Sequence, residues 1–169
     1  MCGEGLGLDS STILKELKSD YDTSEEWLLY YPTRLKQYYQ DLNYISTETN
    51  RPEVFARSEP ANVVIQKVIS LAELDKTEQW LIVIELVETM LAPKKKLFLD
   101  IRRQAAKQRK MVNGHEVWRN YVQRHYADEM VKIYGSSPEK FWLHDNTITN
   151  WWSQIVGLAQ LIASKKRCL

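Results

Sequence analysis

The sequence predicts an all-α, multi-helix protein that ends in a helix-turn-helix. Apolar residues recur at intervals of three and four over most of the 169-residue chain, which is the spacing of amphipathic helices. Six Gly and five Pro are too few for the many tight turns of a β-sandwich or barrel. With 44% hydrophobic residues, 6 Trp, 9 Tyr and 3 Phe, the chain is expected to build a packed core.

The first fifty residues are predicted to form short helices that are separated at local start signals. One helix is expected over residues 13–18. Thr23 and Glu26 fit a capping box that opens a second helix. Pro32 either kinks this helix or begins another, because proline is tolerated in the first turn. The following segment has a clean helical stripe, made of Leu35, Tyr38, Tyr39, Leu42 and Ile45.

The middle of the chain is predicted to contain a loop and two helices. Residues 47–59 are polar and without period, which indicates a loop, and Pro60 can open the next helix. The β-branched run over residues 63–69 also fits a strand, but it lacks strict alternation and favours a helix. Asp75 and Glu78 match a second capping box, which predicts a new helix carrying Trp80.

The remaining elements follow from proline and glycine signals. Pro93 is expected to open a helix that ends near residue 110, and Asn113-Gly114 indicates a turn. A helix over residues 117–134 should end at Gly135. A single turn at residues 137–139 comes next, and Asp145 or Asn146 is expected to cap a last helix over residues 147–165, which brings the total to six to eight helices.

Charge divides the chain into two unlike parts. Residues 1–93 carry 8 Lys/Arg and 16 Asp/Glu, a net −8, whereas residues 94–169 carry 15 Lys/Arg and 6 Asp/Glu, a net +9. Such an asymmetry indicates that the C-terminal part meets a polyanion. We therefore predict an acidic helical region over residues 1–74 for dimerisation or partner contact, and a basic DNA-binding region over residues 75–169.

The last predicted helix carries a polar face without charge, opposite an apolar face built around Trp151 and Trp152. A plain solvated face is the alternative, but such faces are usually rich in Glu and Lys. Asn makes bidentate contacts to adenine, and Ser or Thr hydroxyls serve bases or phosphates. The residues expected to contact DNA bases are Asn146, Thr147, Thr149, Asn150 and Ser153.

A basic segment precedes that helix and is expected to bind the DNA backbone. Phosphate contacts require cations, and they make binding depend on salt. The alternative is a solvated basic face, or one that pairs with the acidic half of the same chain. The predicted backbone contacts are Lys94, Lys95, Lys96, Arg102, Arg103, Lys107, Arg109, Lys110, Arg119 and Arg124.

No motif of an enzyme is present, so we expect no catalytic residue, metal or cofactor. His115, His125 and His144 lack the spacing of a zinc site. Phosphate loops and nucleophile elbows are absent. No apolar run approaches 18 residues, so we expect no membrane contact. Two cysteines at opposite ends are expected to be free thiols, and the protein is expected in the cytoplasm.

The order of segments over residues 60–164 resembles the phage late-operon transcription regulators of the ArpU/RinA type. The matching segments are EPANVVIQKVISLAELDKTEQWL, PKKKLFLDIRRQ, WRNYVQRHYADEMVKIYG and DNTITNWWSQIVGLAQLIA. The resemblance implies a helix-turn-helix similar to sigma-factor region 4, with Thr147-Ile148 at the start of the recognition helix and residues 158–163 at its end. One departure is the nine-residue connection SSPEKFWLH, where three or four residues are usual.

The function expected from these features is sequence-specific DNA binding by a transcription regulator of phage or prophage origin. Its partner is double-stranded DNA, and the N-terminal helices are expected to form a homodimer or to contact RNA polymerase. The alternative is a phage interaction protein that does not recognise sequence, such as a small terminase-like packaging subunit or an inhibitor of a host factor.

Overall fold

The computed structural model describes residues 10–49, 61–108, 111–112 and 115–169, and it is all-α as predicted. Over these residues there are five α-helices, one 3-10 turn and a two-stranded hairpin. The helices are α1 (Ser10–Thr49), α2 (Ala61–Met90), α3 (Pro93–Gln108), α4 (Trp118–Tyr134) and α5 (Asp145–Lys165), the turn is η1 (Pro138–Phe141), and the strands are β1 (Met111–Val112) and β2 (His115–Glu116).

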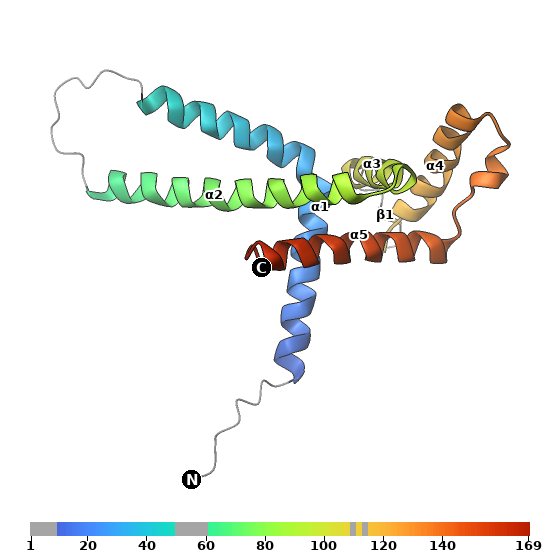
Figure 1. Ribbon diagram of the computed structural model, residues 1–169, viewed down its shortest axis with the longest axis horizontal. Helices are drawn as coiled ribbons and strands as arrows, with labels where there is room; N and C mark the ends of the chain where they lie inside the picture. Colours follow the sequence, from blue (N-terminus) through green and yellow to red (C-terminus); the bar gives the residue numbers. More distant parts are fainter. Residues whose placement is uncertain (1–9, 50–60, 109–110, 113–114) are drawn as a thin grey trace, which may run out of the picture.

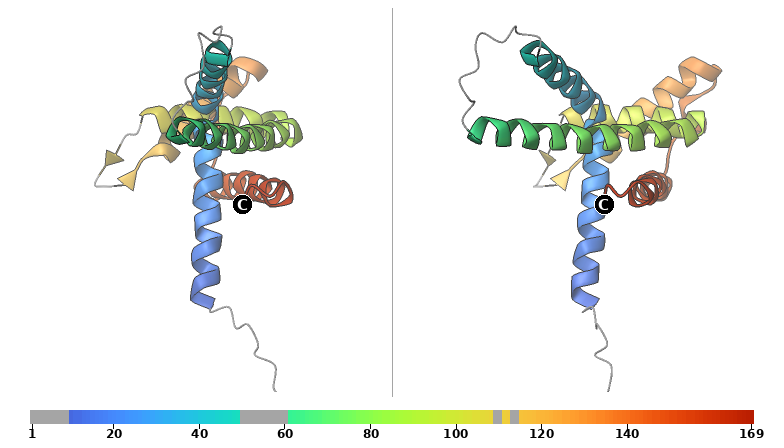
Figure 2. Two further views of the ribbon diagram at one scale, coloured as in Figure 1. Left: turned by 90° about the vertical axis from the view of Figure 1, so that its left-hand side faces the viewer. Right: turned by 60° about the vertical axis from the view of Figure 1, so that its left-hand side comes forward.

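Helices α2 and α5 run side by side in opposite directions, and α1 crosses both (Figure 1). The first half of α1 projects beyond α5, whereas its second half turns to lie along α2. Helix α3 lies across the end of α2 and packs against α4, and η1 packs against α4. The small hairpin projects from the helical body (Figure 2), pairing Met111 with Glu116 and Val112 with His115.

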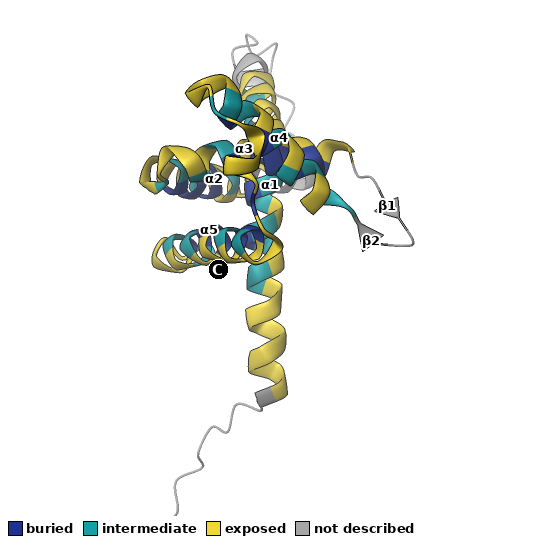
Figure 3. Cartoon of the chain, turned by 90° about the vertical axis from the view of Figure 1, so that its right-hand side faces the viewer, coloured by how far each residue is buried: buried dark blue, intermediate teal, exposed yellow. Residues whose placement is uncertain are grey.

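A single cluster of buried residues joins all five helices (Figure 3). Trp80 of α2 is 1% exposed and stacks on Trp27 of α1, with ring centroids 5.4 Å apart. Leu28 of α1 lies in the same cluster as Ile84 of α2 and Ile155 of α5. The predicted boundary at residue 74 therefore lies inside α2, between two stretches that share one core.

Both predicted capping boxes are wrong, because each lies inside a continuous helix. The carboxylate of Glu26 pairs with Arg34 at 2.8 Å, and Asp75 accepts a hydrogen bond from Gln79 at 3.2 Å. These acids satisfy other side chains rather than helix N–H groups. The prediction of separate short helices is wrong as well, because α1 and α2 run on through these boxes and bury Leu28 and Trp80 just beyond them.

Pro32 does not end α1, because a side chain from another helix replaces the hydrogen bond that proline removes. Proline has no N–H, so the carbonyl of Leu28, four residues earlier, loses its helical donor. The Nε of Arg103 in α3 donates to this carbonyl at 2.8 Å. The helix is bent in its middle (Figure 1), as expected where proline interrupts the hydrogen-bond ladder.

The helix starts and stops predicted in the second half are largely confirmed. Pro93 begins α3, and Gly135 follows α4 with a φ of 66°, the left-handed conformation that favours glycine. The predicted turn at Pro138 is η1. The cap of α5 is His144, without a side-chain hydrogen bond, so the expected cap at Asp145 or Asn146 is wrong by one or two residues. Pro60, residues 50–59 and Asn113-Gly114 lie outside the described residues.

We predict that Arg103 and Pro32 are energetically coupled. Arg103→Met should lower the free energy of unfolding by about 3–5 kcal/mol, because it leaves Glu88 and the Leu28 carbonyl buried without their partner. In a Pro32→Ala background the loss should shrink by roughly 0.5–3 kcal/mol, since an alanine at this position would supply the missing N–H. Urea unfolding of the four proteins, followed by circular dichroism, measures this coupling. Strictly additive losses would contradict it.

Candidate nucleic-acid interface

One side of α5 is exposed and carries no charge from Asn146 to Ser164. The opposite side, with Ile148, Trp152 and Ile155, is buried against α1 and α2. We call the exposed positions the uncharged face of α5, and they are Asn146, Thr149, Asn150, Ser153, Gln154, Gly157, Leu161 and Ser164. Four of the five predicted base contacts are on this face, and the fifth, Thr147, is half-buried at its edge.

The predicted base contacts differ in how far their polar groups are already used. The hydroxyl of Thr149 donates to the carbonyl of Asp145 at 2.9 Å, the back-bond typical of threonine inside helices. Ser153 borders α1, where its side chain is hydrogen-bonded to Tyr21. Burial, and then Glu25, raise the pKa of the Tyr21 hydroxyl, whereas the hydrogen bond with Ser153 lowers it. Within the described part of the chain, no hydrogen bond engages the side-chain amides of Asn146 and Asn150. These two amides are therefore open to a ligand.

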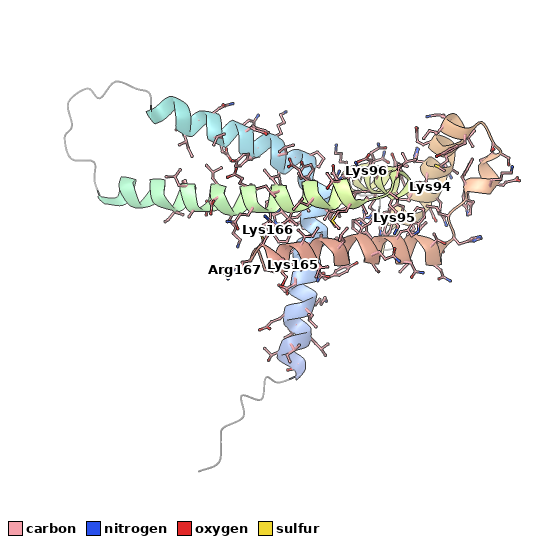
Figure 4. All side chains as sticks on the ribbon, in the orientation of Figure 1. Lys94, Lys95, Lys96, Lys165, Lys166 and Arg167 are labelled. Atoms are coloured by element: carbon pink, nitrogen blue, oxygen red, sulfur yellow. The ribbon has the colours of Figure 1, made fainter. Side chains whose placement is uncertain are left out.

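Gln154, which was not among the predicted base contacts, continues the row of amides. Asn146, Asn150 and Gln154 are spaced by four residues, so they lie on one side of the helix, about 6 Å apart along its axis. The Nζ of Lys95, at the start of α3, donates to the Oε1 of Gln154 at 2.7 Å. In Figure 4, Lys95 lies between α3 and α5. The four-residue spacing would have revealed Gln154 from the sequence.

The predicted basic segment divides into exposed and buried parts. Lys94, Lys96, Lys107, Arg119 and Arg124 are exposed, and Lys95 is half-buried beside α5. Figure 4 places Lys96 on the side of α3 away from α5, so the three lysines do not form one patch. Arg109 and Lys110 lie outside the described residues. Fewer cations therefore lie beside the uncharged face of α5 than the sequence predicts.

Arg102 and Arg103 are buried structural residues, which corrects their prediction as phosphate contacts. Arg102 is 2% exposed, and its guanidinium lies 4.2 Å from the ring of Trp118 and 5.2 Å from that of Trp152. It also lies 3.9 Å from the carboxylate of Glu25. Arg103 is 6% exposed and contacts Glu88 at 2.6 Å. Charge counting alone could not separate them, because both follow an ordinary basic run on α3.

A second group of cations lies at the C-terminal end of α5 and was missed as part of the site. Lys165, Lys166 and Arg167 are exposed and lie together at this end (Figure 4). Arg167 has a φ of 60°, and the N–H of Cys168 donates to the carbonyl of Ala163 at 2.9 Å, which closes the helix end as a Schellman motif. Lys165 follows Gln154 by eleven positions, about 16 Å along the helix.

Acidic groups border the same helix, but other side chains of the protein engage them. Glu25 of α1 accepts a hydrogen bond from the indole Nε1 of Trp152 at 2.8 Å. Asp145, in the first turn of α5, accepts one from Gln123 of α4 at 3.1 Å. Its position at a helix N-terminus also stabilises its negative charge. The acids therefore serve to hold α1 and α4 against α5.

The described residues contain no group of three or more His, Cys, Asp or Glu placed to hold a metal ion. In the same residues, no helix combines the length and the apolar character needed to cross a membrane. Comparison with protein-family models, curated proteins and solved structures finds no match to this chain. The resemblance to ArpU/RinA-type regulators therefore stays a prediction.

We predict that the arginines of α3 act on stability and that its exposed lysines do not. Arg102→Gln should lower the free energy of unfolding by about 3–5 kcal/mol, because it removes a buried cation from two indoles and a carboxylate. Lys107→Gln, the matched control on the exposed side of the same helix, should change it by less than about 0.5 kcal/mol. Thermal or urea unfolding compares the two. Equal losses would show that the burial of Arg102 has no energetic role.

Proposed function

We propose that this protein is a sequence-specific DNA-binding transcription regulator that inserts α5 into the major groove. The observation that supports the proposal best is the uncharged face of α5, whose exposed amides and hydroxyls lie beside Lys95. An α-helix with its side chains is about 10–12 Å wide, close to the roughly 12 Å width of the major groove. Amides and hydroxyls are the groups that hydrogen-bond to base edges there.

The cations around α5 suit contacts with the phosphates on either side of the groove. Lys165, Lys166 and Arg167 lie at one end of the helix, and Lys95 lies near its middle. Arg119 and Arg124 of α4 are further exposed cations of the proposed DNA-binding region. Such contacts position the protein without selecting sequence, and each adds to the salt dependence of binding.

The order α4, η1, α5 fits a helix-turn-helix in which an extra 3-10 turn lengthens the connection. Four of the nine connecting residues form this turn, where three or four residues in all are usual. In this interpretation α4 crosses the DNA backbone and α5 is the recognition helix. The resemblance to phage late-operon regulators supports a role in phage or prophage transcription.

The N-terminal helices are proposed to contact another protein, either a second copy of the chain or RNA polymerase. The first turns of α1 project from the body (Figure 2) and expose Ile13, Leu14 and Leu17. The second half of α1 and the adjoining part of α2 expose Tyr39, Leu42, Tyr44, Ile69 and Leu71. Exposed apolar groups of this extent are typical of protein interfaces.

The alternative, an interaction protein that does not recognise sequence, is distinguished by two measurements. A terminase-like packaging subunit should assemble into a large ring, and light scattering would report its mass. Selection of bound DNA from a random pool would then return no preferred sequence. A small assembly together with an enriched sequence supports the regulator.

We predict that Asn150→Ala weakens binding to the selected DNA site by about 1–3 kcal/mol and relaxes the choice of base at one position. The amide is exposed and is removed without disturbing the core. Fluorescence anisotropy with the selected site and a scrambled site measures both effects. Gln40→Ala on α1, another exposed amide far along the chain, is the control. Unchanged affinity and base choice in Asn150→Ala would contradict base contact by α5.

We predict that Lys165→Gln combined with Lys166→Gln weakens binding to all DNA sequences alike. The slope of log K against log salt should become shallower by about 2, since each phosphate contact contributes roughly 0.9. Lys15→Gln with Lys36→Gln removes the same charge from α1 and should leave the slope unchanged. Titrations at several salt concentrations provide the slopes. A wild-type protein with no salt-dependent DNA binding would refute the proposed function.

A further inference from the structure

We propose that Lys95 and Gln154 form one guanine-recognising unit, so that the DNA site combines guanine with the adenine expected for Asn150. This inference rests on the proposed function and specifies its substrate. The observation behind this inference is the hydrogen bond of 2.7 Å between the Lys95 ammonium and the Gln154 amide oxygen, which joins α3 to the uncharged face of α5.

The bond determines which groups Gln154 can offer to a ligand. An ammonium has only donors, so it must face the amide oxygen and not the amide nitrogen. One lone pair of the oxygen is then engaged by a cation, and both N–H donors of the Gln154 NH₂ group remain available. The ammonium of Lys95 also has further N–H groups beyond the one used. Together, the two side chains present mainly donors, because the Lys95 ammonium faces the one oxygen that could accept.

A group made up mainly of donors is most complementary to the base edge with the most acceptors. Guanine presents two acceptors in the major groove, N7 and O6, whereas adenine presents one acceptor and one donor, and thymine one acceptor beside a methyl group. Cytosine presents the N4 donor, which would oppose the N–H groups of Lys95 and Gln154. Asn150 has no such partner among the described residues and keeps both a donor and an acceptor, the combination that matches adenine.

The helices hold this unit in place before DNA binds. Phe98 of α3 contacts the ring of Trp151 edge-on, with centroids 5.7 Å apart, which fixes the start of α3 beside α5. Lys95 lies one turn before Phe98, on the first turn of α3, and it is half-buried. Its side chain is therefore held toward α5 by the bond to Gln154, unlike the exposed Lys94 and Lys96.

The spacing between Asn150 and Gln154 on α5 determines how far apart the adenine and the guanine lie in the DNA site. Gln154 follows Asn150 by four residues, about 6 Å along the helix axis. Successive base pairs are about 3.4 Å apart. Because the groove is inclined to the DNA axis, a helix that lies along it would thus contact two bases about one to two base pairs apart.

The test is selection of bound DNA from a random pool by the wild type and by Gln154→Glu. Glutamate in place of Gln154 keeps the pairing with Lys95 but offers only acceptors toward the groove. We expect the wild type to prefer guanine at one position by at least about tenfold, the size of discrimination that paired base contacts provide. In Gln154→Glu this preference should be lost or turned toward cytosine, with the adenine position unchanged. Gln160→Glu, the same charge change on the same helix, should weaken binding without changing the guanine position.

The outcomes separate this inference from the proposed function. Wild-type binding without a guanine preference, or a guanine preference that survives Gln154→Glu, would overturn the inference and leave DNA binding intact. Uniform loss of affinity in Lys95→Met with all base preferences kept would also overturn it, because Lys95 would then contact only phosphates. A wild type that binds no DNA refutes the proposed function itself. Circular dichroism melts confirm that the variants are folded.

Discussion

The hydrogen bond from Arg103 to the carbonyl of Leu28 holds the arrangement of helices together. It occupies the acceptor that Pro32 leaves without a helical donor, and so lets α1 continue through a proline. The same guanidinium contacts Glu88 of α2 and lies 5.2 Å from the ring of Tyr31. One side chain of α3 thereby holds α1 and α2 at the bend, and α1 can cross α5 with one half and follow α2 with the other.

This arrangement determines which side of α5 remains exposed. Helices α1 and α2 cover its apolar side, and α3 borders it through the Phe98–Trp151 contact and the Lys95–Gln154 bond. Arg102 packs against Trp118 and Trp152, so the buried part of the basic segment supports α5 from within the core. The two arginines thus act on the proposed interface indirectly, by holding the helix that presents it.

Much of the second half of the fold could be predicted, because its signals are stereochemical. Pro93 lacks the N–H that a first helical turn does not need, and Gly135 adopts a positive φ that other residues avoid. The capping boxes at Thr23 and Asp75 failed because a cap is a local preference of about 1 kcal/mol. Burial of Leu28 and Trp80, each five residues after the start of a box, outweighs a preference of that size.

Helical periodicity in the sequence was enough to establish the all-α class, the amphipathic α5 and its uncharged face, since it assigns residues to sides without any knowledge of neighbours. Which basic residues lie at the surface depended instead on how the helices pack. Adjacent lysines and arginines look alike in a charge count, but Arg102 and Arg103 enter the core beside indoles, carboxylates and the carbonyl that Pro32 leaves without a donor. A buried charge needs partners from distant segments, and folding alone brings those partners together.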